Sequence, residues 1–280
     1  MRISFQRGDI KNLITTGVIY FAAVFFLPTL LPQTLSVHLR LNIALGLSIL
    51  ATVIMFFIAS KSHNDIDRGK RESNILIIIA IGLAGFVAMM LVQGIINGLL
   101  QYLAKIFEFQ ASSKNTSNVV QIIKLNPLFI GYVVFLGPMM EELFFRKAVF
   151  GYFYDIMLGS KQWIRFTIPA LITGILFAIP HDGFSPIMVL YIMMSFVFSF
   201  LYLKTKDTQL FFSFLSIFFK LYFSVSFKNI SSFSFKIPEK ITTAPSSKVF
   251  SIFFKSSIKT STNIFETTKS YFSEILSTKF

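Results

Sequence analysis

Residues 127–154 read PLFIGYVVFLGPMMEELFFRKAVFGYFY, an apolar run that carries Glu141, Glu142 and Arg146 near its middle. About 20 apolar residues are enough for a helix to cross a hydrocarbon layer that is ~30 Å thick. Ionised side chains at that depth cost several kcal/mol, and they usually mark a functional site. The run therefore predicts a helical membrane span with a functional cluster inside it.

A structural ion pair explains part of this cluster. Glu142 and Arg146 stand four positions apart, a spacing at which one helix face brings the two side chains together. Glu141 lies one residue earlier, and about 100° of helical rotation turns it onto another face. The pairing accounts for Glu142 and Arg146, whereas Glu141 needs a further role.

The composition is that of a polytopic membrane protein, because the 280 residues are 54% hydrophobic and only 14% charged, with a mean hydropathy of +0.69. The sequence predicts an all-α transmembrane bundle of about six to seven spans. The expected spans are Leu13–Leu31, Leu41–Ser60, Ile75–Leu99, Pro127–Tyr154, Ile164–Ile179, Pro186–Leu203 and a seventh, Leu210–Phe227, that is interrupted by Lys220.

The net charge of +13 comes from basic residues scattered over loops and the tail, so membrane topology explains it better than a nucleic-acid partner does. By the positive-inside rule, two clusters lie in the cytoplasm and the loop Pro32–Arg40 lies outside. The clusters are Arg2, Arg7 and Lys11 before the first span, and Lys61, Arg68, Lys70 and Arg71 after the second. The charges leave the orientation of the later spans open.

A polar, Ser/Asn-rich connection, Lys105–Lys124, divides the chain. It separates an N-terminal three-span region, residues 1–104, from a core, residues 127–210, that carries the polar intramembrane residues. The amino-acid composition changes abruptly in residues 211–280, which contain 15 Phe and 16 Ser but no Gly, His, Met, Asp or Arg. This bias predicts a poorly ordered C-terminal tail. A change of reading frame near Leu210 is one hypothesis for its origin.

A second polar motif, Phe177-Ala178-Ile179-Pro180-His181, ends the fifth apolar run. We expect the first motif helix to begin at Pro138, because Gly137-Pro138 reads as a break and proline suits a first helical turn. With a turn near Gly159-Ser160 and 1.5 Å per residue, Glu141 lies about 27 Å before the turn and His181 about 32 Å after it. An antiparallel hairpin would bring the two residues to a similar depth, although Pro180 biases Ile179 away from helical geometry.

A carboxylate beside an imidazole can activate water. The carboxylate acts directly as a general base, or the two groups hold a divalent metal that lowers the pKa of a bound water. Both mechanisms remain open on the residues alone.

Glu141-Glu142-x-x-x-Arg146 followed by Phe177-x-x-x-His181 resembles the first two motifs of the CAAX protease and bacteriocin-processing family of intramembrane proteases. The resemblance covers roughly residues 127–203 and implies a helical membrane bundle. It implies that Glu141 activates the attacking water and that His181 helps to bind that water, a metal or the oxyanion. It further implies that Glu142 and Arg146 support the site, and that a divalent metal such as zinc has Glu141 and His181 among its ligands.

The chain departs from this family in one respect. The family's third motif supplies a second histidine on a later helix, followed four residues on by an asparagine or a similar residue, and no histidine follows His181 here. A zinc site would therefore be short of a ligand.

The resemblance implies a CAAX-type endopeptidase in the bacterial plasma membrane. Its substrate would be a membrane-associated peptide or protein, prenylated or bacteriocin-related. The missing motif favours an alternative, a catalytically inactive bacteriocin self-immunity or adaptor protein. A transporter would require an inverted repeat of broken helices, and the first three spans contain no counterpart of Glu141 or His181.

Overall fold

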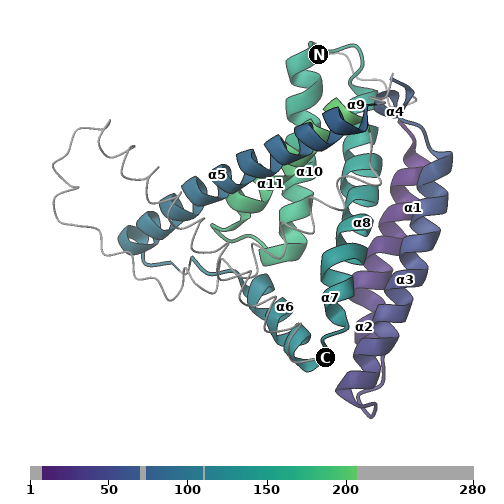
Figure 1. Ribbon diagram of the computed structural model, residues 1–280, viewed down its shortest axis with the longest axis vertical. Helices are drawn as coiled ribbons and strands as arrows, with labels where there is room; N and C mark the ends of the chain where they lie inside the picture. Colours follow the sequence, from purple (N-terminus) through teal and green to yellow (C-terminus); the bar gives the residue numbers. More distant parts are fainter. Residues whose placement is uncertain (1–7, 70–73, 110, 207–280) are drawn as a thin grey trace.

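The computed structural model describes residues 8–69, 74–109 and 111–206, and within these ranges every regular element is a helix (Figure 1). In chain order the elements are α1 Ile10–Phe21, η2 Ala22–Phe26, α2 Leu27–Leu30, α3 Val37–Lys61, α4 Asp65–Arg68, α5 Ile75–Phe107, α6 Lys114–Leu125, α7 Phe129–Gly131, η3 Tyr132–Leu136, α8 Gly137–Glu141, η4 Glu142–Phe150, α9 Gly151–Ile156, α10 Gln162–Asp182 and α11 Met188–Thr205. The elements labelled η are π-helical.

Among the described residues, five helices are long and apolar enough to cross a membrane, which confirms the multi-pass helical bundle. They are Ile10–Leu30, Val37–Lys61, Leu76–Phe107, Gln162–Asp182 and Met188–Thr205. Five of the expected spans correspond to these helices. The seventh expected run, Leu210–Phe227, and the tail, 211–280, lie outside the described residues.

The remaining expected span is a rod at the centre of the bundle that runs without interruption from α7 to α9 (Figure 1). Its η4 segment packs against α1, α3, α10 and α11, and all nine residues of η4 are buried. The expected helix start at Pro138 is wrong, because helical geometry continues through Gly137 from the π-helical segment η3. Proline lacks an N–H and clashes with the carbonyl four residues earlier in a regular helix. The wider turn of a π-helix relieves that conflict.

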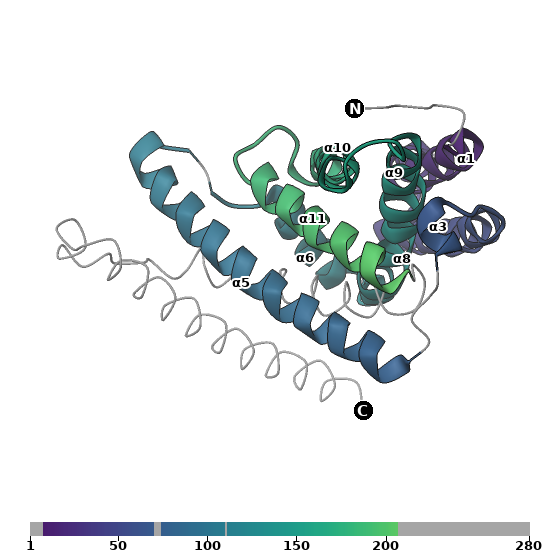
Figure 2. The same ribbon diagram turned by 90° about the horizontal axis from the view of Figure 1, so that it is seen from above.

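Helix α5 is much longer than the other spans. Its 33 residues correspond to about 50 Å of helix. It crosses α11 diagonally, and its far end extends well beyond the rest of the bundle (Figures 1 and 2).

The short turn α4 ties the N-terminal helices to the central rod. Asn64 Nδ2 donates a hydrogen bond to the Tyr202 hydroxyl at 2.7 Å and another to the backbone carbonyl of Lys147 at 3.2 Å. The Tyr202 hydroxyl donates to Asp67 at 2.8 Å, and Lys147 Nζ lies 3.1 Å from the other Asp67 oxygen. We call these four residues the α4 cluster. Because its groups are largely buried, the cluster fixes how the rod, α4 and α11 meet.

We predict that Gly151→Ala destabilises the protein through this cluster. A Cβ at Gly151 would lie 2.3 Å from Asn64 Nδ2, so Asn64 would have to move away from its two partners. Overpacking of this kind costs about 1–3 kcal/mol. The measurement is the unfolding free energy in detergent micelles, with Gly131→Ala as the control, because a Cβ there meets nothing within 4 Å. Equal stability of the two variants would contradict the role of the cluster.

Candidate active site

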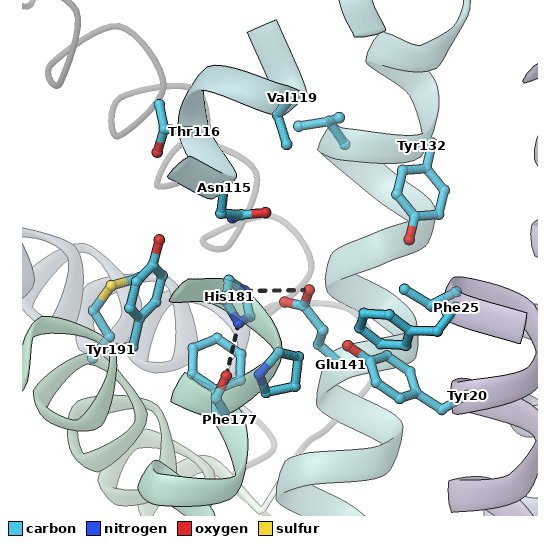
Figure 3. Close-up of a pocket in the computed structure, with 14 residues that line it drawn as sticks. Tyr20, Phe25, Asn115, Thr116, Val119, Tyr132, Glu141, Phe177, His181 and Tyr191 are labelled. Atoms are coloured by element: carbon cyan, nitrogen blue, oxygen red, sulfur yellow. Dashed lines mark hydrogen bonds and ion pairs between the residues drawn. The ribbon is translucent and has the colours of Figure 1, made fainter. Parts of the chain in front are cut away.

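A cavity of about 170 Å³ lies between the central rod and its neighbours. It is lined by residues from α1, η2, α6, η3, α8, α10 and α11, and most of its lining is apolar or aromatic (Figure 3). Glu141 and His181 both line it. Ionisable groups at membrane depth usually face such a cavity in the interior of a bundle.

The cavity brings together the two residues that the sequence placed at similar depth. Glu141 ends α8, and His181 is the second-last residue of α10. The Nε2 atom of His181 lies 3.9 Å from Glu141 Oε1, and the two side chains are only 9% and 11% exposed (Figure 3). This separation leaves room for a water molecule hydrogen-bonded to both atoms, since two contacts of about 2.8 Å would meet there at about 90°.

The ring of His181 is held in one orientation. Its Nδ1 lies 2.7 Å from the carbonyl oxygen of Phe177, which can only accept, so Nδ1 carries a proton and Nε2 faces Glu141. The ring also packs between Phe177 and Tyr191, with centroid distances of 4.5 and 4.6 Å. Pro180 does not interrupt this arrangement, because α10 continues through it to Asp182.

Glu142 and Arg146 are not among the residues that line the cavity. They form the expected pair, with Arg146 Nε 3.4 Å from Glu142 Oε1, and the side chains are 0% and 2% exposed. The Arg146 guanidinium lies between two aromatic rings, 4.6 Å from the centroid of Phe177 and 4.9 Å from that of Phe198. Arg146 therefore joins the rod to α10 beneath His181 and to α11, through cation–π contacts.

Four residues that the sequence reasoning did not single out also line the cavity: Tyr20, Asn115, Tyr132 and Tyr191. Tyr20 and Tyr132 turn their hydroxyls towards the side of the cavity that holds Glu141, and Asn115 directs its carboxamide into the cavity (Figure 3). Tyr20 belongs to the first span, which the sequence had grouped apart from the chemistry. A tyrosine inside an apolar span was the available signal, since a buried hydroxyl usually has a polar partner.

The position of Tyr132 depends on the π-helical segment. Tyr132 and Glu141 are nine positions apart, and a regular α-helix would place them about 180° from each other. A π-helical turn inserts one residue, which reduces this angle to about 80°. η3 therefore brings Tyr132 and Glu141 onto the same cavity.

Asp182 fixes helix α6 over the cavity. Its carboxylate accepts hydrogen bonds from the Ser113 hydroxyl, from the Tyr191 hydroxyl at 2.9 Å and from the backbone N–H of Asn115 at 3.1 Å. Ser113 is the N-cap of α6, so Asp182 also places a negative charge at the positive end of that helix. His181 and the first turn of α6 are thereby held on the same cavity.

The described residues do not form a complete metal site. They contain no group of three or more His, Cys, Asp or Glu side chains placed to hold one ion. Glu141 and His181 supply two ligands, whereas a catalytic zinc ordinarily takes three from the protein. The expected zinc therefore stays a prediction.

The helices and the cavity define an integral, multi-pass membrane protein with a buried carboxylate–imidazole site. Residues 123–223 match the family Rce1-like, described as type II CAAX prenyl endopeptidase Rce1-like. This segment includes Glu141, Glu142, Arg146 and His181, and the match supports the CAAX protease and bacteriocin-processing family that the two motifs indicated.

Two curated proteins are similar to the chain. The membrane-embedded CAAX protease MroQ of Staphylococcus aureus (strain USA300) is 30% identical over 166 residues, which cover 59% of this chain and 65% of MroQ. YdiL of Bacillus subtilis (strain 168), which carries a provisional membrane-peptidase name, is 30% identical over 154 residues, 55% of this chain and 58% of YdiL. The chain thus spans less than two thirds of either relative, and no solved structure matches it.

Proposed function

We propose that this chain is an intramembrane endopeptidase of the CAAX type that hydrolyses a peptide bond in a membrane-associated substrate. The observation that carries the proposal is the 3.9 Å approach of Glu141 Oε1 to His181 Nε2 in a cavity between the helices. The names of both relatives favour this enzymatic interpretation over a self-immunity protein.

In the proposed reaction, Glu141 is the general base. A water molecule donates one hydrogen bond to Glu141 and the other to His181 Nε2, which is an acceptor because the proton of the neutral ring is on Nδ1, facing the Phe177 carbonyl. Glu141 takes the proton as the water oxygen attacks the carbonyl carbon, and the C=O electron pair moves onto oxygen. When the intermediate collapses, the C–N bond breaks and Glu141 returns the proton to the leaving amine.

The cavity also offers donors for the oxyanion. The hydroxyls of Tyr20 and Tyr132 and the amide of Asn115 line the same space as Glu141. Donors held in place before the reaction stabilise developing charge without reorganisation. The steps above use no metal. That the enzyme is a zinc metalloprotease is a separate part of the proposal.

The proposed substrate is a peptide or protein held at the membrane, prenylated or bacteriocin-related. A largely apolar cavity wall suits such a substrate, and Val24, Phe25 and Val133 are among the residues that form it. No nucleic acid takes part in this proposal.

We predict that purified protein in liposomes cleaves peptides and that His181→Ala loses at least about 100-fold in rate, the lower end of the contribution of a positioned acid–base group. The probe is a mixture of proteome-derived peptides with and without a lipid anchor, and the products are read by mass spectrometry. His38→Ala is the control, since His38 is exposed at the start of α3. Cleavage no faster than in empty liposomes, or equal cleavage by His181→Ala, would refute the proposed function.

A further inference from the structure

The bundle formed by the described helices has two ends. At one of them, polar contacts join the termini of several helices. Ser62, which follows α3, donates to Asp9 at the start of α1 at 2.6 Å. Arg165, in the first turn of α10, lies 2.6 Å from Asp65 in α4. Through the α4 cluster, the C-terminal end of α11 joins the same end. We call this the α4 end, and α2, α6 and α7 lie at the opposite end (Figure 1).

Basic residues are concentrated at the α4 end. Among the described residues, those at this end are Lys11, Lys61, Arg68, Lys161, Arg165, Lys204 and Lys206. The opposite end has Arg40, Lys105, Lys114 and Lys124. Lysine and arginine in short loops favour the cytoplasmic side. The structure thus adds the connection 157–161 and the C-terminal end of α11, which the sequence alone left unassigned, to the cytoplasmic side.

An interfacial aromatic residue agrees with this assignment. Trp163, in the first turn of α10, is 66% exposed beside the basic residues Lys161 and Arg165. Tryptophan is enriched at the boundary between lipid and water. The start of α10 is therefore at a membrane boundary, and the neighbouring basic residues assign it to the cytoplasmic one.

The candidate active site lies far from that boundary. His181 is 19 residues along α10 from Gln162, which corresponds to about 28 Å of helix. Glu141 is 15 residues from Ile156 at the end of the rod, which corresponds to about 20 Å. In a hydrocarbon layer of ~30 Å, both residues lie in the half of the membrane remote from the cytoplasm.

The first turn of α6 forms the wall of the cavity at this remote end. Asn115, Thr116 and Val119 line the cavity, and Asp182 holds this turn in place. The exposed side of α6 carries Ser117 and Asn118, which are polar. A helix that is apolar on one side and polar on the other is suited to the membrane surface.

We propose that the candidate active site lies in the extracytoplasmic half of the membrane, and that its substrate is a peptide segment presented at the outer leaflet. The substrate part rests on the proposed peptidase function. The orientation rests only on charge and geometry, so it can be tested without any activity.

The absence of cysteine from all 280 residues makes single-cysteine labelling direct. Asn118→Cys places a thiol on the exposed side of α6, and Gln162→Cys places one at the exposed start of α10. In intact cells, a membrane-impermeant maleimide is expected to label Asn118→Cys at once. Gln162→Cys is expected to react only after permeabilisation. The reverse pattern, or labelling of both sites in intact cells, would overturn the orientation.

A second measurement tests from which side of the membrane the substrate reaches the site. A peptide cleaved in the liposome assay is added to right-side-out and to inverted membrane vesicles. Cleavage is expected in right-side-out vesicles, and cleavage confined to inverted vesicles would overturn the proposal. If no peptide is cleaved in any preparation, the proposed function and the substrate class fail, while the labelling result still decides the orientation.

Discussion

Glu141→Gln is expected to lower the rate of peptide cleavage by about 10²–10⁴, the range of a general base. Glutamine has nearly the same shape as glutamate but cannot take a proton from water. The side chain ends in a cavity beside His181, and glutamine preserves its volume there. We therefore expect the fold to persist while the reaction stops.

The measurement is the initial rate with a cleaved peptide, together with the thermal unfolding midpoint in the same detergent. Glu108→Gln is the matched control, because Glu108 is exposed at the end of α5. Activity within about twofold of the unsubstituted protein would rule out Glu141 as the base. Such a result would favour a non-catalytic role for Glu141.

Arg146→Met is expected to destabilise the protein by about 3–5 kcal/mol, the usual cost of removing one partner of a buried ion pair. Methionine fills much of the volume between Phe177 and Phe198 but removes the cation. The carboxylate of Glu142, which is 2% exposed, would then remain buried without the charge it faces. Because Arg146 supports α10 beneath His181, activity should fall as well.

The double variant Glu142→Gln/Arg146→Met distinguishes the free energy lost by leaving a buried charge unpaired from the free energy lost by changed packing. Removing both charges should recover a large part of the lost unfolding free energy, measured by denaturant titration in micelles, because the uncompensated charge is gone. Arg40→Met serves as the control, since Arg40 makes an exposed hydrogen bond to Gln33. A double variant as unstable as Arg146→Met alone would show that the pair itself contributes little.

The sequence predicted the features that follow from hydrophobicity and helical periodicity. The apolar runs predicted helices that cross a membrane, and a spacing of four predicted the contact between Glu142 and Arg146. The hairpin estimate placed Glu141 and His181 at similar depth, and the structure brings them within 3.9 Å. Each of these depends on regular helical geometry, which simple residue spacing captures.

Other features depend on departures from that geometry or on packing between distant segments. Helical structure passes through Pro138 because a π-helical segment precedes it, and spacing rules assume an α-helix. Tyr20 reaches the cavity from the first span, and Asn115 reaches it from a connection that read only as polar. Contacts between such remote segments are set by tertiary packing, which residue spacing within one helix does not describe.

The length of α5 has a consequence for the surrounding lipid. Its candidate span, Leu76–Phe107, measures about 48 Å, whereas the hydrocarbon layer measures ~30 Å. The helix meets this mismatch by tilting, by local thickening of the bilayer, or by placing its last turns, which carry Gln101 and Lys105, at the membrane surface. Since α5 packs on α11, which contributes Tyr191 to the cavity, acyl-chain length becomes a variable that acts on the site from outside the protein.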